Sequence, residues 1–173
     1  GANIKVRDMI LNIEEALEDW TDEAAIRDYL RKMVRGEVYD HAGLIYGIGH
    51  AVYTNSDPRA VLLKEMARQL AAEKGRNKEF DFMERLERLA IETVYEMKGR
   101  GKTLCANVDF YSGFVYDLIG LPREIYTPLF AMARIVGWCA HRNEELNFEG
   151  KRIIRPAYRC VADINEYTPL NRR

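Results

Sequence analysis

The chain has 173 residues, of which 47% are hydrophobic and 31% are charged, a balance typical of a globular protein with enough apolar material for a core. Lysine and arginine number 26 and aspartate and glutamate 27, so the net charge of −1 disfavours a chain-wide nucleic-acid-binding surface. No apolar run reaches the roughly 20 residues of a membrane helix, and no signal peptide opens the chain. With only three scattered cysteines, we expect a cytoplasmic protein with reduced thiols and no membrane association.

Helical periodicity begins directly after residue 1 and runs along most of the sequence. Apolar side chains recur at steps of three and four, which places them on one face of an amphipathic helix. Because the chain opens inside such a pattern on Gly1 and not on Met, we expect it to be a fragment of a longer protein. The expected helices cover residues 4–20, 21–35, 58–74, 81–98, 107–118 and 127–147. We predict an all-α fold, with one short strand at Ile153-Ile154 as the exception.

Helix starts are marked by capping residues. Thr21 is expected to cap the second helix. Asp57-Pro58 has the order of an N-cap followed by a first helical residue, and capping alone suffices to explain Asp57. The apolar face of the helix that follows is expected to consist of Leu62, Leu63, Met66, Ala67 and Leu70.

A glycine-rich loop, Gly47-Ile48-Gly49-His50, lies before this third helix. Glycines before a histidine allow the backbone to approach a ligand closely and place the imidazole at the tip of a loop. Such a histidine can donate a hydrogen bond to a carbonyl oxygen or supply a proton. A histidine packed in a structural loop is the alternative. A dinucleotide-binding motif is excluded, because no strand precedes the glycines and the third glycine is absent.

Three arginines are candidates for binding an anion. Arg59 lies in the first turn of a helix, where the dipole disfavours a cation, so a bound carboxylate or phosphate would explain it. A solvated surface arginine is the alternative. Arg134 stands inside the apolar segment 130–138, where it needs either an internal acid or a bound carboxylate. Arg155, before Pro156, is the weakest of the three, and by itself it would be interpreted as surface charge.

Asp109 stands among aromatic residues in the segment Asn107–Gly113. Such surroundings can raise the pKa of a carboxylate, which suits a general base. An N-cap aspartate at the start of a helix is the alternative. The sequence contains no metal-ligand cluster, no Ser/His/Asp arrangement and no phosphate-binding loop, so we expect no metal.

The motifs become specific when they are taken in chain order. They are GIGHAVY at 47–53, DPR at 57–59, NVDFYSG at 107–113, LFAMARIVGWCAH at 129–141 and Arg155-Pro156. In this order they closely resemble the C-terminal half of citrate synthases. The opening Gly1-Ala2-Asn3 resembles the end of that family's His-Gly-Gly-Ala-Asn motif, and the resemblance extends to about Arg159.

The resemblance implies a transferase that condenses acetyl-CoA with oxaloacetate and hydrolyses the citryl-CoA formed, without a metal or a tightly bound cofactor. It implies Asp109 as the base that removes a methyl proton from acetyl-CoA, and His50 as the group that polarises the oxaloacetate carbonyl. Arg59 and Arg134 would bind substrate carboxylates. Arg155 would reach the active site of the other subunit of a homodimer. The residues implied in CoA binding are Leu44, Ile45, Gly47, Gly49 and Asn107.

The resemblance also divides the chain. Residues 1–113 would form the small, mobile domain that binds substrate and CoA, and residues 114–173 the end of the large helical domain. The family's other catalytic histidine would fall just before Gly1, so we predict that this chain alone is inactive. Thr54 stands where many relatives carry Lys or Arg near the CoA phosphates. Two other functions stay open: a 2-methylcitrate synthase that uses propionyl-CoA, and a non-catalytic helical domain for ligand binding or interaction.

Overall fold

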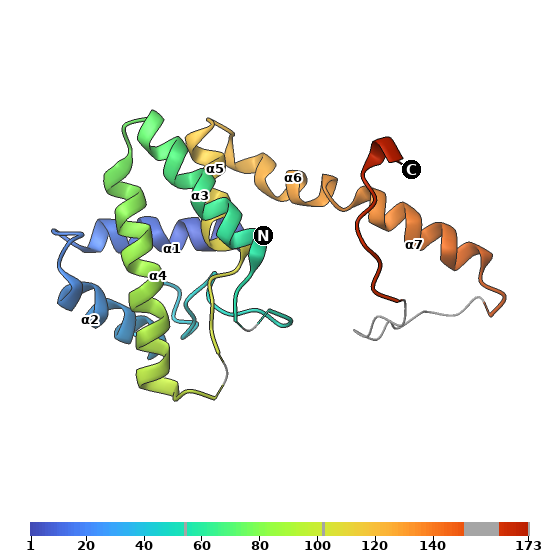
Figure 1. Ribbon diagram of the computed structural model, residues 1–173. Helices are drawn as coiled ribbons and strands as arrows, with labels where there is room; N and C mark the ends of the chain where they lie inside the picture. The colour runs from blue at the N-terminus through green and yellow to red at the C-terminus, as the bar shows by residue number, and fades with distance from the viewer. Residues whose placement is uncertain (54, 102, 151–162, 173) are drawn as a thin grey trace. The chain divides into compact units, whose positions relative to one another are not determined.

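The computed structural model describes residues 1–53, 55–101, 103–150 and 163–172. The chain falls into two compact units, Gly1–Ala133 and Arg134–Arg173. The helices of the first unit are α1 (Ala2–Ala16), α2 (Glu23–Val34), α3 (Pro58–Glu73), α4 (Asn77–Lys98), α5 (Val108–Leu118), the 3₁₀ turn η1 (Arg123–Ile125) and α6 (Tyr126–Met132). The second unit contains α7 (Ile135–Asn147) and the 3₁₀ turn η2 (Leu170–Arg172) (Figure 1).

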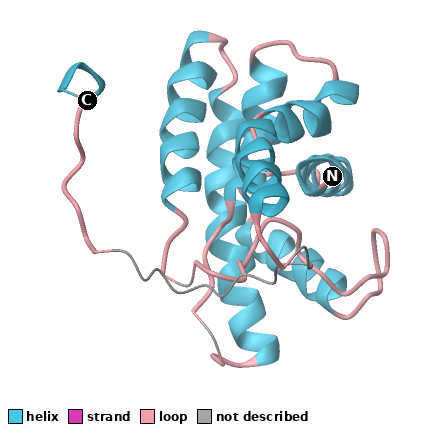
Figure 2. Ribbon diagram, turned by 90° about the vertical axis from the view of Figure 1, so that its right-hand side faces the viewer, coloured by secondary structure: helices cyan, strands magenta, loops and turns pink. Residues whose placement is uncertain are grey.

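The all-α prediction is confirmed. Within the described ranges the structure contains helices and loops, and its one piece of β-type pairing is an isolated bridge between Ile48 and Ala106 (Figure 2). The strand expected at Ile153-Ile154 lies outside the described residues. In the part of the chain that the structure describes, no helix is both long and apolar enough to cross a membrane.

The core of the first unit forms where α5 packs between α1 and α3, and where α4 packs against α2 and α3. The helices α1, α2 and α4 each contribute one apolar face at the spacing that the sequence predicts. The largest fully buried side chains are Met9, Ile10, Ile13, Ile26, Leu30, Met33, Phe82, Met83, Phe110, Tyr111, Phe114 and Tyr126. This packing gives the first unit a fixed frame, and the candidate site is built on its α3 and α5 edges.

One local expectation for the first unit was wrong, and a second was right only in part. Asp22, not Thr21, caps α2: its carboxylate accepts the N–H groups of Ala24 and Ala25 at 2.9 and 3.1 Å. The Thr21 hydroxyl instead donates to Asp19 at 2.7 Å, because a carboxylate two residues back is within its reach.

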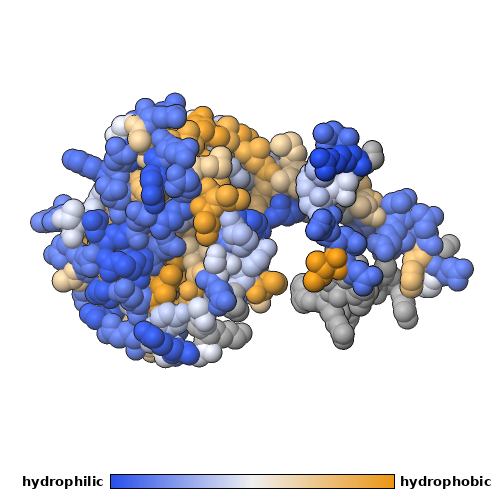
Figure 3. Space-filling model, viewed as in Figure 1, coloured by the Kyte–Doolittle hydropathy of each residue, from blue (hydrophilic) through white to orange (hydrophobic). Residues whose placement is uncertain are grey.

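The face of α3 also differs from the expectation. Leu62 and Met66 are 69% and 52% exposed, and the residues that are buried are Ala60, Ala67 and Ala71. Of the expected face, Ala67 is buried and Leu63 and Leu70 are partly buried against the core, so the expectation holds for these three and fails for Leu62 and Met66. Small side chains at the buried positions allow α3 to lie close to α5. Figure 3 shows apolar surface gathered over α3 and α5.

The single helix expected over 127–147 is interrupted. A 3₁₀ turn and α6 come first, and the chain leaves the helical path at Ala133 and Arg134, whose ψ angles of −6° and −12° are too close to zero to continue an α-helix. Arg134 is half-buried and forms the N-cap of α7. It therefore lies at a helix junction and not in the middle of a continuous buried helix.

Candidate active site

The loop before α3 is tied to the segment that leads into α5. Gly49 N–H donates to the Cys105 carbonyl at 2.7 Å, and Asn107 N–H donates to the Gly47 carbonyl at 2.8 Å, on either side of the Ile48–Ala106 bridge. The Asn107 side-chain amide adds a bond to the Gly49 carbonyl at 2.9 Å. These bonds fix the position of His50, at the end of the loop, relative to the first turn of α5.

Glycine is required at position 47 for two reasons, its backbone conformation and the lack of space for a side chain. Its φ of +83° lies in the left-handed region that favours glycine. A Cβ at this position would stand 2.9 Å from the Phe110 ring, 3.0 Å from a methyl of Val6 and 3.1 Å from the Phe110 Cα. The loop can therefore lie directly on α5 and α1 only because residue 47 has no side chain. This is the structural role behind the first glycine of the predicted motif.

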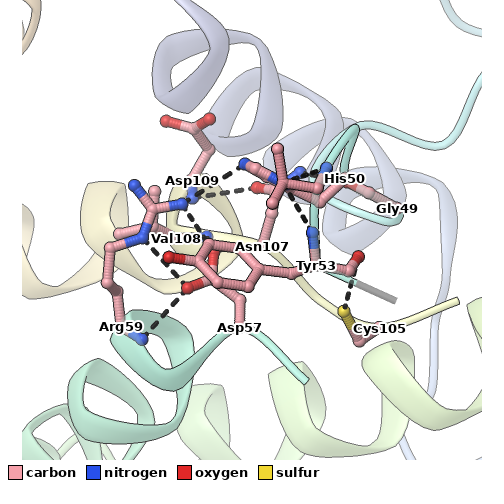
Figure 4. A network of polar contacts seen from close by, with 10 residues as sticks. Gly49, His50, Tyr53, Asp57, Arg59, Cys105, Asn107, Val108 and Asp109 are labelled. Carbon is pink, nitrogen blue, oxygen red and sulfur yellow. Dashed lines mark hydrogen bonds and ion pairs between the residues drawn. The ribbon is translucent and has the colours of Figure 1, made fainter. Parts of the chain in front are cut away.

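His50 is held in one tautomer by backbone donors. Its Nδ1 accepts the N–H groups of Val52 and Tyr53 at 3.0 and 3.1 Å (Figure 4). A ring nitrogen that accepts two hydrogen bonds carries no proton, so the neutral imidazole has its proton on Nε2. The ring also packs on Tyr53, with ring centroids 4.8 Å apart. His50 therefore presents an exposed N–H donor, the group needed to bind a carbonyl oxygen.

Arg59 points to the same place. Its Nη2 lies 3.4 Å from His50 Nε2, and since both nitrogens carry protons the pair is a set of two donors that one oxygen atom could bridge. The guanidinium also lies over the Tyr53 ring, 5.3 Å from its centroid. Arg59 is therefore not a freely solvated arginine: it is held beside the imidazole.

The anion that holds Arg59 is Asp57. The carboxylate of Asp57 is fully buried and accepts the Arg59 backbone N–H and Nε–H, both at 3.0 Å, and Nη2–H at 2.8 Å. It also accepts the N–H of Val108 at 3.1 Å. Burial by itself would raise the pKa of Asp57, but these hydrogen bonds and the charge of Arg59 hold it below the ordinary value.

Asp109 lies in the first turn of α5, near the Arg59 guanidinium and the His50 imidazole (Figure 4). It is not the N-cap, because Asn107 accepts the Asp109 N–H at 3.0 Å. Partial burial raises the pKa of the Asp109 carboxyl, and the charge of Asp57 adds to this, while Arg59, the Gly1 ammonium and His50 oppose it. The Asp109 side chain therefore does not cap the helix, and its raised pKa makes it a stronger base than an ordinary aspartate.

The structure therefore brings together six of the residues singled out in the sequence: Gly47, Gly49, His50, Arg59, Asp109 and Asn107, the last of which joins the loop to α5. Leu44 is exposed at the start of the loop, whereas the Ile45 side chain is buried in the core.

The remaining predicted residues cannot be placed at this site. Arg134 belongs to the second unit, which is described by itself. Arg155 and Thr54 lie outside the described residues. The described ranges hold no group of three His, Cys, Asp or Glu residues that could bind a metal ion.

Sequence reasoning missed the contributions of Tyr53 and Asp57. Tyr53 lies in the same short motif as His50, and no local pattern indicates that its ring contacts both His50 and Arg59. Asp57 already had an explanation as a helix cap. The available signal was the spacing of Asp57 and Arg59: an arginine two residues after an N-cap aspartate can fold back onto that carboxylate.

The first unit is an all-α domain that brings the motifs around His50, Arg59 and Asp109 together on one edge. The family model described as "Citrate synthase, C-terminal domain" matches residues 1–157. The chain belongs to the citrate synthase family. It is 36% identical to a citrate synthase of Synechocystis over its whole length, and 37% identical over 83% of its length to a 2-methylcitrate synthase of Shewanella oneidensis.

Solved structures agree with this assignment. One is the ternary complex of carboxymethyl coenzyme A and oxaloacetate with citrate synthase from Thermoplasma acidophilum, at 30% identity and a TM-score of 0.64 over 99% of this chain. Another is citrate synthase from Thermotoga maritima, at 33% identity and a TM-score of 0.64 over the whole chain. The chain spans 39% of the Synechocystis relative and 42% of each of these structures.

Proposed function

We propose that this chain is the C-terminal part of an enzyme that condenses acetyl-CoA with oxaloacetate to give citrate and CoA. The observation that carries the proposal is the pair of donors, His50 Nε2–H and Arg59 Nη2–H, set 3.4 Å apart beside the Asp109 carboxylate. Oxaloacetate has a keto oxygen next to a carboxylate, and a histidine beside an arginine matches these two groups. The relatives named citrate synthase support the same reaction.

In the proposed mechanism Asp109 removes a proton from the methyl group of acetyl-CoA. The resulting carbon nucleophile attacks the keto carbon of oxaloacetate, whose oxygen becomes an alkoxide. His50 donates a hydrogen bond from Nε2 to this oxygen, and Arg59 binds the neighbouring carboxylate. The alkoxide takes up a proton, which balances the one that Asp109 removed, and becomes the hydroxyl of citryl-CoA. Water then cleaves the citryl-CoA thioester and releases citrate and CoA. A thioester methyl is a weak acid, so a carboxylate base needs the enolate to be stabilised at the same time.

The other assignments are carried over from the family. Arg134 would bind a second substrate carboxylate, and Arg155 would act in the other subunit of a homodimer. The CoA contacts would come from Asn107 and from the loop residues Leu44, Ile45, Gly47 and Gly49. Residues 1–113 would be the small domain and residues 114–173 the end of the large domain of a cytoplasmic enzyme.

We expect this chain alone not to turn over. Its histidines are His41, His50 and His141, and none of them occupies the position of the family's enolate-stabilising histidine, which precedes the Gly-Ala-Asn motif. The test measures CoA release from acetyl-CoA and oxaloacetate by the purified chain, beside an intact citrate synthase at equal concentration. A comparable rate from the chain would contradict this expectation.

A second function is favoured by the 2-methylcitrate synthase relative, whose identity of 37% over 83% of the chain is close to the 36% of the Synechocystis citrate synthase over the whole chain. Such an enzyme would use the same base and the same donors, since propionyl-CoA differs from acetyl-CoA by one methylene. Comparing kcat/KM for acetyl-CoA and propionyl-CoA in the full-length protein decides between them. A higher value for propionyl-CoA would replace citrate by 2-methylcitrate as the product.

A further inference from the structure

We propose that Asp57 is a positioning residue that couples the orientation of Arg59 to the first turn of α5, where Asp109 lies. This inference rests on the proposed function for its kinetic consequences, but not for its structural ones. Helix capping accounts for one of the hydrogen bonds that Asp57 accepts, the bond from Arg59 N–H. The other bonds come from the Arg59 guanidinium and from Val108.

The first step of the argument is the fixation of Arg59. Both Asp57 oxygens take part, with Oδ1 accepting Nε–H and Oδ2 accepting Nη2–H. The carboxylate and the guanidinium therefore form a bidentate pair. The Arg59 side chain is 39% exposed, whereas that of Asp57 is 0% exposed. An arginine so exposed would sample many rotamers without this buried anchor. Asp57 therefore orders Arg59 before any substrate arrives, and ordering in advance lowers the cost of binding.

The second step links Asp57 to the base. Asp57 Oδ2 accepts the N–H of Val108, the residue directly before Asp109, and thereby joins the start of α3 to the start of α5. The negative charge of Asp57 also raises the pKa of the Asp109 carboxyl and so opposes the groups that lower it, namely Arg59 from α3, the chain terminus at Gly1 and His50 from the loop. The same carboxylate therefore acts on both the substrate-binding arginine and the base.

Asp57→Asn is the test variant, and Asp22→Asn is its matched control. Asparagine caps helices about as well as aspartate, so both variants should keep their helix starts. Asp22 caps α2 in the same way, through Ala24 and Ala25, and belongs to no part of the candidate site. A general effect of losing a cap charge would therefore occur in both variants, whereas a positioning effect would occur only in Asp57→Asn. Should Asp57→Asn not fold, Asp57→Ser keeps a capping oxygen and replaces it.

The first measurement uses this chain as it is. Carbon-13 NMR follows the Asp109 carboxyl over a pH series in the unaltered chain and in both variants. Loss of the Asp57 charge removes one influence that raises the Asp109 pKa and leaves Arg59 unneutralised, so the titration midpoint should move to lower pH in Asp57→Asn. Asp22→Asn should leave the midpoint unchanged. An unchanged midpoint in Asp57→Asn would overturn the proposed link to the base.

The second measurement is the kinetics of the full-length protein. We expect KM for oxaloacetate to rise about tenfold in Asp57→Asn, the factor that corresponds to ordering one long side chain on binding. KM for acetyl-CoA should stay constant, and the acid limb of the pH–rate profile should move to lower pH. Equal rises in both KM values, or the same rise in Asp22→Asn, would overturn the positioning role. A shifted NMR midpoint in a protein that does not condense oxaloacetate would instead contradict the proposed function and leave the coupling intact.

Discussion

Asp109→Asn should lower kcat/KM of the full-length enzyme by about 10²- to 10⁴-fold, the range that a general base contributes. The amide has nearly the shape of the carboxyl but cannot accept the methyl proton of acetyl-CoA. The cap of α5 belongs to Asn107, so the helix start should survive the change. CoA release at saturating oxaloacetate is the measurement. An activity within a few-fold of the unaltered enzyme would remove Asp109 from the mechanism.

The same variant should not destabilise the fold. The pKa of Asp109 is raised in the folded protein, so its carboxyl favours folding at pH values below its unfolded pKa, and this contribution is lost as the pH rises through the folded value. At pH 7 the ionised, half-buried carboxylate is therefore a cost, which the neutral amide removes. Thermal unfolding of Asp109→Asn at pH 7 should give a Tm equal to or above that of the unaltered chain. A clearly lower Tm would show that the carboxylate has a structural role.

The raised pKa also sets a pH dependence. Asp109 must be ionised to act as a base, so kcat/KM should fall as the pH is lowered through its pKa, at higher pH than for an ordinary aspartate. In a longer chain Gly1 would carry no ammonium charge, which removes one of the influences that lower the pKa. The acid limb should then lie higher in the full-length enzyme than the titration of this chain alone indicates.

Gly47→Ala is the second large effect, and it acts on stability. We expect a loss of about 3 kcal/mol in the free energy of unfolding, of which about 1 comes from the positive φ and about 2 from the clash with Phe110 and Val6. The Phe110 Cα cannot move aside as a flexible side-chain end could, so the loop must lift from α5. Urea unfolding followed by circular dichroism measures the loss.

Gly75→Ala separates the two contributions. Gly75 ends α3 with a φ of +69°, but a Cβ there would have no neighbour within 4 Å. It should therefore lose only the part due to φ, about 1 kcal/mol. An equal loss in the free energy of unfolding of the two variants would mean that the clash at position 47 does not contribute to the destabilisation.

The sequence was sufficient to predict the helical fold and to single out the polar residues that the structure brings together at the candidate site. Helical spacing is a local property, and residues such as Ile10, Ile13, Leu86 and Leu89 are buried where that spacing puts them. The motifs around His50, Arg59 and Asp109 likewise stand in short segments. The structure was needed to decide between a functional and a purely structural role for each of these residues. For Asp109, the hydrogen bond to Asn107 shows that Asn107 and not Asp109 caps the helix.

Features that depend on contacts between distant segments could not be predicted. The inward face of α3 is set by how closely it approaches α5, a distance that no local pattern contains. The break at Ala133 and Arg134 has no Gly or Pro to mark it. The double use of Asp57 depends on Val108, which lies far away along the chain and becomes a neighbour only after α3 and α5 have packed.

The bonds that join the glycine loop to α5 also determine when the site can form during folding. The bond from the Asn107 side chain to Gly49 spans 58 positions, and both α3 and α4 lie between its ends. Closing so long a stretch costs chain entropy, which is lower once α3 and α4 have already folded as a helical hairpin. We therefore expect His50 and Asp109 to come together late in folding. The amide protons of Gly49 and Asn107 should then exchange with solvent sooner than those in the middle of α4, because local opening of this region would not require the core to unfold.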